Sequence, residues 1–186
     1  MRIVAGKHRG RPLLVPEGLT IRPTQDRTRE SLFNLLEHGR LASDGSRVAG
    51  AIVLDAFCGT GALTLEALSR GALSATLIDN SNVAISTARA NAASLDETDA
   101  VTILRADARH PPTAPMAHTL VFLDPPYGKD RAPEAISGLD AAGWIAEGAL
   151  IAVETSRTED LELPEGFTLE DQRRYGRAKI SLVTKD

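Results

Sequence analysis

Ile52-Val-Leu-Asp-Ala-Phe-Cys-Gly-Thr-Gly-Ala62 decides the fold, because a short apolar strand runs into a turn with two glycines and then into a helix. Bare glycine backbone at such a turn lets a ligand approach closely, and the start of the helix can face an anionic group. From this point strands and helices alternate, which predicts a mostly parallel α/β sheet covered on both faces. Such sheets bind ligands at the carboxyl ends of their strands.

The hydrophobic pattern gives the expected elements. Strands are expected at 52–56, 75–78, 101–105, 120–123, 149–153, 167–173 and 178–184, and helices at 24–37, 62–69, 81–94 and 133–145. The last two strands have no helix between them, so they should form a hairpin. Residues 2–5 and 11–15 predict another hairpin with a basic tip. The predicted organisation is an N-terminal extension over 1–40, made of this hairpin and a helix, and a main domain over 41–186.

Length and composition narrow the class of protein. A chain of 186 residues fits one sizeable domain. Cys58 is the only cysteine, which excludes an internal disulfide, and the four histidines lack metal-ligand spacing, so no structural metal is expected. We find neither a signal peptide nor an apolar run of the roughly 20 residues that a membrane span needs. These features predict a cytoplasmic protein.

Positive charge gathers at the two ends of the chain. The net charge is −4, but residues 1–29 carry seven Lys or Arg against two acids, or +5, which leaves −9 for the remainder. A second basic run spans 173–179. Such asymmetry can steer a polyanion to one face, although charge runs are often only solvated surface. The candidate phosphate contacts are Arg9, Arg11, Arg22, Arg27, Arg29, Arg173, Arg174, Arg177 and Lys179.

Acidic residues follow the first three expected strands of the sheet. Asp79 lies 24 residues past Asp55, where a carboxylate can bind ribose hydroxyls, and Asp107 follows the third strand. A nicotinamide dinucleotide is the less favoured ligand, because Thr64 stands where its fingerprint asks for glycine or alanine, and no second phosphate site is evident. S-adenosylmethionine has a ribose and a carboxylate but no pyrophosphate, so it fits this pattern better.

Asp124-Pro-Pro-Tyr127 follows the fourth strand and points to the chemistry. The exocyclic amine of a nucleobase is a poor nucleophile, because its lone pair is delocalised into the ring. The Asp124 carboxylate and the Pro125 carbonyl can accept its N–H protons and draw the lone pair out of the ring plane. Tyr127 can stack on the base. A rigid turn after a strand is the alternative interpretation of the same tetrapeptide.

Two further stretches carry a family resemblance: Arg2-Ile-Val-Ala-Gly-Lys-His-Arg-Gly-Arg11 and Arg22-Pro-Thr-Gln-Asp-Arg-Thr-Arg-Glu-Ser-Leu-Phe-Asn34. Together with the motifs at 55–61 and 124–127, they resemble the bacterial 16S rRNA guanine-N2 methyltransferases, from Met1 to about Lys185. The resemblance implies a Rossmann-like class I fold, with a seven-stranded sheet whose last strand is antiparallel. It also implies an RNA-engaging N-terminal extension and action on 16S rRNA of the small ribosomal subunit or its precursor. We expect the protein to be a monomer.

The same resemblance implies the site. S-adenosylmethionine would contact Asp55, Phe57, Gly59, Gly61, Asp79, Asn80, Asp107 and Ala108, while Asp124, Pro125 and Tyr127 would be catalytic. Cys58 departs from the alanine or glycine usual in the family, and we expect it to be an inert buried side chain. Two alternatives stay open: the same chemistry on DNA adenine or a protein glutamine, and a non-catalytic ribosome-assembly factor.

Overall fold

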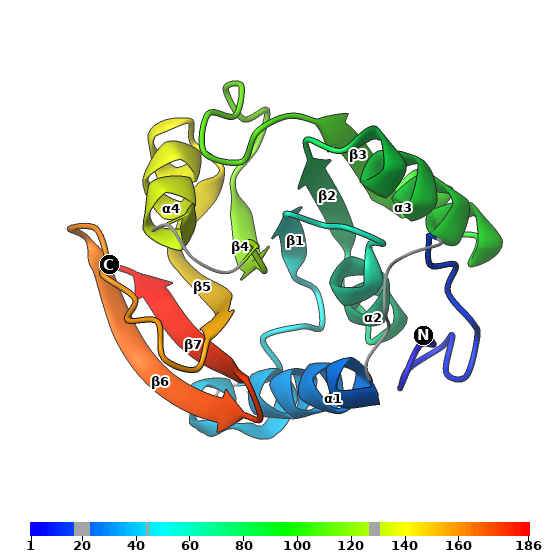
Figure 1. The fold of residues 1–186 in the computed structure, drawn as a ribbon, viewed down its shortest axis with the longest axis horizontal. Coiled ribbons are helices and arrows are strands. Elements are labelled where there is room, and N and C mark those ends of the chain that lie inside the picture. Colours follow the sequence, from blue (N-terminus) through cyan, green and yellow to red (C-terminus); the bar gives the residue numbers. More distant parts are fainter. Residues whose placement is uncertain (17–22, 44, 127–130) are drawn as a thin grey trace.

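The protein, described here by a computed structural model, is defined over residues 1–16, 23–43, 45–126 and 131–186. These residues form a seven-stranded sheet with the order β3-β2-β1-β4-β5-β7-β6 (Figure 1). Its strands are β1 (Ile52–Ala56), β2 (Ser74–Asp79), β3 (Val101–Arg105), β4 (His118–Leu123), β5 (Ile145–Ser156), β6 (Phe167–Tyr175) and β7 (Ala178–Lys185). Neighbouring strands from β3 to β5 are parallel, and β7 runs antiparallel to both β5 and β6. The predicted fold class is therefore confirmed.

Helices cover both faces of the sheet. One face packs against α1 (Pro23–His38), α2 (Ala62–Ser69) and α3 (Asn82–Ser94), and the other packs against α4 (Arg131–Ala141). Short 3₁₀ turns occur at Arg40–Ala42 and Thr98–Ala100. Because the central strands are buried on both faces, they are apolar almost throughout rather than alternating. No helix among the described residues is both long and apolar enough to cross a membrane.

The chain changes direction in the sheet between β1 and β4. It runs outward from β1 through β2 to β3, then returns to the other side of β1 to form β4 and β5. Ala56 pairs with Leu123 at the carboxyl ends of β1 and β4, so the turn that starts at Phe57 and the loop that starts at Asp124 leave the sheet side by side. Open α/β sheets bind their ligands at such a switch point.

The first 40 residues pack into the rest of the protein. Residues 1–16 form the expected hairpin, held by backbone hydrogen bonds on either side of an antiparallel bridge between Arg2 and Pro12, although its arms are too short to be strands. Ile3 and Leu13 are buried against α2 and α3, and α1 contributes Phe33 to the core beneath the sheet. Residues 1–40 therefore share hydrophobic cores with residues 41–186. The RNA-engaging role of this segment stays a prediction.

The expected helix at 133–145 is misplaced at both ends. It begins at Arg131 and ends at Ala141, since Gly143 adopts a left-handed conformation with φ of 81° and breaks the helix. Ile145 then starts β5, which is much longer than the strand expected at 149–153. At the other boundaries, the expected elements agree with the structure within about two residues.

Candidate active site

A cavity of about 1010 Å³ opens at the carboxyl ends of four neighbouring strands. Each strand or the residue after it contributes one carboxyl group to the cavity wall: Asp79 from β2, Asp55 from β1, Asp124 after β4 and Glu154 from β5. Small-molecule sites in proteins commonly occupy about 300 to 1,000 Å³. The cavity is therefore large enough to hold a nucleotide-like cofactor and part of a second ligand.

The glycine turn between β1 and α2 forms one wall of the cavity, and we call residues 57–61 the cofactor loop. Phe57, Gly59 and Gly61 have left-handed backbones with φ of 72°, 54° and 77°. A Cβ atom on Gly59 would meet no atom within 4 Å, so this backbone is bare toward the cavity. A Cβ on Gly61 would lie 3.1 Å from Leu77 Cδ2. Gly59 thus leaves room for a ligand, whereas Gly61 lets the start of α2 approach β2 closely.

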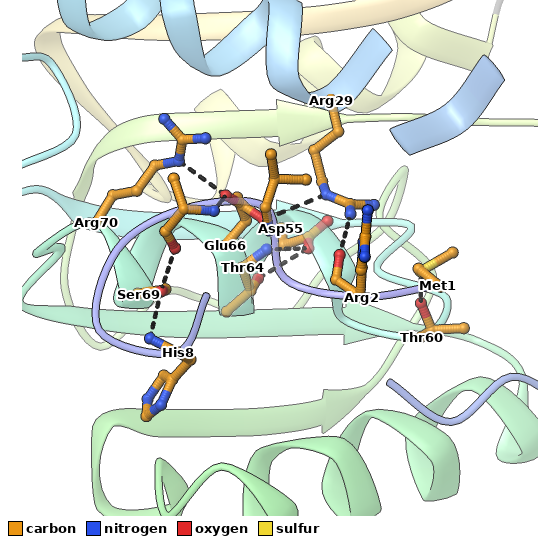
Figure 2. Close-up of polar contacts among 12 residues, drawn as sticks. Met1, Arg2, His8, Arg29, Asp55, Thr60, Thr64, Glu66, Ser69 and Arg70 are labelled. Carbon is orange, nitrogen blue, oxygen red and sulfur yellow. Dashed lines mark hydrogen bonds and ion pairs between the residues drawn. The ribbon is translucent and has the colours of Figure 1, made fainter. Parts of the chain in front are cut away.

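Asp55 lies beneath the cofactor loop and is 1% exposed. Its Oδ2 accepts hydrogen bonds from the Thr64 hydroxyl at 2.8 Å and from the Thr64 amide at 3.3 Å (Figure 2). Burial raises the pKa of Asp55 to about 6, with the hydrogen bonds from Thr64 opposing the shift. Asp55 is therefore a buried carboxylate that is costly to ionise, which suggests that it is kept for a role other than stability.

Asp79 holds the cofactor loop at the end of β2. Its Oδ2 accepts a hydrogen bond from the Gly59 amide at 3.0 Å, and its Oδ1 accepts one from the Ser81 amide at 2.8 Å. Asp79 and Asn80 both line the cavity. A carboxylate has further lone pairs, so these two bonds leave acceptor sites on Asp79, and its contact with a ribose stays a prediction.

Asp107 and Ala108 lie outside the wall of the cavity. Both oxygens of Asp107 accept hydrogen bonds from Arg109, the shortest of them from Nη2 at 2.7 Å. These bonds lower the pKa of Asp107 to about 2. The carboxylate of Asp107 is thus engaged by Arg109. A contact between Asp107 and the adenine of S-adenosylmethionine would have to form beside this ion pair.

Cys58 is buried in the cofactor loop. Burial raises the pKa of its thiol well above the ordinary value, and the negative charges of Asp55 and Asp79 raise it further. Because the thiolate is the nucleophilic form of cysteine, this thiol is unsuited to covalent catalysis. The structure therefore agrees with the expectation that Cys58 is inert.

Asp124 opens into the cavity directly after β4, while Pro125 beside it is buried. Glu154 is its neighbour in the sheet, because β4 and β5 pair through Leu123 and Val153. Loss of water around the Asp124 carboxyl group raises its pKa well above the ordinary value, and the nearby charges of Glu154 and Asp55 add to this shift. Two neighbouring carboxyl groups therefore face the same part of the cavity. Tyr127 lies outside the described residues.

The predicted phosphate contacts divide into two groups. The exposed ones are Arg9, Arg11, Arg27, Arg173, Arg174 and Arg177, of which Arg11 also bonds to the Ser94 carbonyl and Arg173 to Asp171, and their contact with phosphate stays a prediction. Arg29 and Lys179 are only 5% and 3% exposed, and their charged groups bond to other parts of the protein. Phosphate contacts by these two side chains therefore do not fit the structure. Arg22 lies outside the described residues.

Several cavity residues were missed by the sequence reasoning. Glu154 carried a usable signal, since it follows a buried apolar strand just as Asp124 does. Arg177 lines the cavity as well as being a candidate phosphate contact, and Tyr175 lies beside it on the β6–β7 hairpin. Met1 and Val15 reach the cavity from the N-terminal segment, a contact that no local pattern reveals.

Comparison with known proteins identifies the family. The model of the family described as "Conserved hypothetical protein 95" matches residues 1–184. Ribosomal RNA small subunit methyltransferase D of Escherichia coli K12 is 35% identical over 194 residues, which cover 100% of this chain and 90% of that protein. The chain belongs to this methyltransferase family.

Solved structures agree with this membership. The structure of yhhF from Escherichia coli matches this methyltransferase with a TM-score of 0.83 and 35% identity, over 100% of this chain and 98% of that one. The Synechocystis magnesium protoporphyrin IX methyltransferase with bound SAM is 16% identical, with a TM-score of 0.65 over 90% of this chain and 86% of that one. The latter likeness concerns the fold alone.

Proposed function

We propose that this methyltransferase transfers a methyl group from S-adenosylmethionine to the exocyclic N2 amine of one guanine in 16S rRNA, acting as a cytoplasmic monomer on the small subunit or its precursor. The named relative from Escherichia coli acts on small-subunit ribosomal RNA. The observation that carries the proposal is the meeting of the cofactor loop with Asp124 and Glu154 in one cavity. Donor and acceptor of the methyl group can therefore bind side by side.

The wall of the cavity formed by the cofactor loop suits S-adenosylmethionine. Asp55 and Asp79 supply negative charge toward a cationic ligand, Phe57 supplies apolar surface, and Gly59 leaves its backbone open. When bound, the cofactor supplies a methyl carbon whose bond to sulfur breaks, with its electron pair passing to sulfur, as the bond from the amine nitrogen forms. The family membership of the chain and these lining groups both support S-adenosylmethionine as the cofactor.

Asp124 positions the target amine. Its carboxylate accepts an N–H hydrogen bond, which draws the nitrogen lone pair out of conjugation, and it then accepts the released proton or passes it to water. Because its pKa is raised, the ionised Asp124 holds an accepted proton more tightly than an ordinary carboxylate does. Holding the amine and the methyl group in line contributes more to the rate than proton transfer does, because well-oriented reactants reach effective molarities of about 10⁵ M or above.

The carboxylate pair favours guanine over adenine. The Watson–Crick edge of guanine presents two neighbouring donors, N1–H and the N2 amine, which match acceptors on Glu154 and Asp124. Adenine presents an acceptor at N1, which would face a carboxylate oxygen. To enter the cavity, the guanine must be unpaired or flipped out of its helix. This complementarity supports an RNA guanine rather than a DNA adenine as the target.

Mass mapping of small-subunit RNA from cells lacking the protein tests the proposal. We expect one guanine to lose its methyl group, and purified protein to restore it on RNA or immature subunits from those cells. Methylation of naked DNA or of a release factor instead would support the alternative substrates. Normal methylation of all guanines in the deletion strain, together with a defect in subunit maturation, would favour the non-catalytic assembly factor.

A further inference from the structure

Residues 1–16, here called the N-terminal strap, lie against α2 and α3 and reach the edge of the cavity. Figure 2 shows the strap crossing close to the cofactor loop, with Met1 beside Thr60. We propose that the strap holds the cofactor loop in its binding conformation, and that Asn91 is the positioning residue that joins the two. This role differs from RNA engagement, and it rests on the proposed function only in taking S-adenosylmethionine as the ligand of the loop.

The strap is fixed to α2 by polar contacts. The Glu66 carboxylate accepts hydrogen bonds from the amides of Val4 at 2.8 Å and Ala5 at 3.0 Å. The Ser69 hydroxyl accepts one from the His8 amide at 3.0 Å, as Figure 2 shows. At Gly6 the fit is tight, because a Cβ atom there would lie 1.9 Å from the Ser69 carbonyl oxygen. The strap therefore has one defined position on the helix that follows the cofactor loop.

Buried charges reinforce this position. Glu66 is fully buried, and its charge is balanced by Arg70 at 2.9 Å and Arg29 at 3.5 Å. Arg29 Nη2 also donates to the Arg2 carbonyl of the strap at 2.5 Å. Removing one partner from a buried ion pair is strongly destabilising, because it leaves the other charge buried and uncompensated. Arg29 thus serves the strap and the cavity wall, which explains why an arginine is buried here.

Asn91 of α3 connects the strap to the cofactor loop. Its Oδ1 accepts the Leu14 amide at 2.7 Å, and its Nδ2 donates to the Leu14 carbonyl at 3.1 Å and to the Thr60 carbonyl at 2.9 Å. Asn91 itself is fully buried, so its amide group has to find its partners within the protein. The Thr60 hydroxyl also donates to Met1 Sδ at 3.6 Å. One amide side chain therefore sets the positions of Leu14 and Thr60 together.

The consequence concerns cofactor affinity. The loop has a left-handed backbone at Phe57, which is costly for a residue other than glycine and needs its surroundings to hold it. When only a fraction of molecules has the binding conformation, the apparent dissociation constant rises by the inverse of that fraction. Loss of the strap or of Asn91 should therefore weaken cofactor binding, while the turnover rate at saturating cofactor changes little.

The experiment measures binding of S-adenosylhomocysteine to the purified full chain by calorimetry, without RNA. Asn91→Ala should weaken binding about 10-fold, and Gly6→Ala should weaken it in the same direction. The control is Leu139→Ala in α4, which opens a core cavity on the opposite face of the sheet and lowers the melting temperature without touching the strap. Wild-type affinity in both Asn91→Ala and Gly6→Ala, or an equal loss in the control, would overturn the proposal.

Hydrogen exchange of the wild-type protein gives a second test that needs no variant to fold. Coupling between sites is reciprocal, so S-adenosylhomocysteine should slow exchange of the Val4 and Leu14 amides but not that of the Gln172 amide in β6. Unchanged exchange in the strap at saturating ligand would contradict the coupling. Failure of S-adenosylhomocysteine to bind the wild-type chain at all would instead contradict the proposed cofactor, and this role with it.

Discussion

Replacing Asp55 by asparagine should make the protein more stable at neutral pH while weakening cofactor binding. Asp55 is a carboxylate without an arginine or lysine among the causes of its pKa shift, and burial is the largest of them. The asparagine oxygen can still accept the hydrogen bonds from Thr64, but it carries no charge that burial would penalise. The variant therefore separates the cost of ionising Asp55 from the rest of the site.

The size and pH dependence of the gain follow from the pKa of Asp55. Folding raises this pKa from 3.8 to about 6, and each unit corresponds to about 1.4 kcal/mol, so ionisation costs the folded state about 3 kcal/mol at neutral pH. Between these values the folded protein binds more protons than the unfolded chain, so the stability contributed by this group falls as pH rises. The advantage of Asp55→Asn should be full above pH 6 and should disappear toward pH 4.

Urea unfolding of the wild type and of Asp55→Asn across pH 4 to 8 measures this difference directly. Asp99→Asn, at an exposed carboxylate, is the matched control and should show no such trend. Calorimetry with S-adenosylhomocysteine should show weaker binding by Asp55→Asn. A stability difference that is independent of pH, or one that grows toward acid pH, would refute the reasoning.

Two further predictions concern the acceptor side of the cavity and the RNA. Glu154→Gln should lower the pKa of Asp124, because it removes a neighbouring negative charge. The acid limb of the pH profile of the turnover rate should therefore move to lower pH. An unmoved limb would show that the two carboxyl groups are not coupled. Arg177→Ala, at an exposed arginine, should reduce the log-log salt slope of RNA binding by about 0.7. Lys179→Ala should leave that slope unchanged, because this lysine is buried against the Glu159 carbonyl, and a reduced slope in this variant would restore it as a phosphate contact.

The sheet could be predicted from sequence because its central strands are apolar on both faces and because segments with a helical pattern follow β1 and β2. The helix expected at 81–94 begins as predicted, because the Ser81 side chain accepts the Ala84 amide at the start of α3. The end of α4 was missed because Gly143 stops the helix only through its left-handed backbone, while the apolar pattern continues into Ile145. Periodicity alone does not separate the end of a helix from the start of a buried strand.

A site residue could be predicted from the sequence where it lies at the carboxyl end of a predicted strand. Asp79 and Asp124 line the cavity for that reason, and the same logic would have found Glu154. Buried partners were not predictable, because Arg29 and Lys179 resemble exposed cations in a basic run and only the tertiary packing turns them inward. The strap contacts through Asn91 depend on residues 77 positions apart, which no local pattern connects.

The central claim is that Asp124 activates a guanine amine beside the cofactor loop. The most direct measurement is mass mapping of 16S rRNA from a deletion strain that expresses either the wild-type protein or Asp124→Ala. We predict that the wild type restores one methylated guanine, whereas Asp124→Ala restores none although it still binds S-adenosylhomocysteine. Full methylation of that guanine by Asp124→Ala would contradict the account.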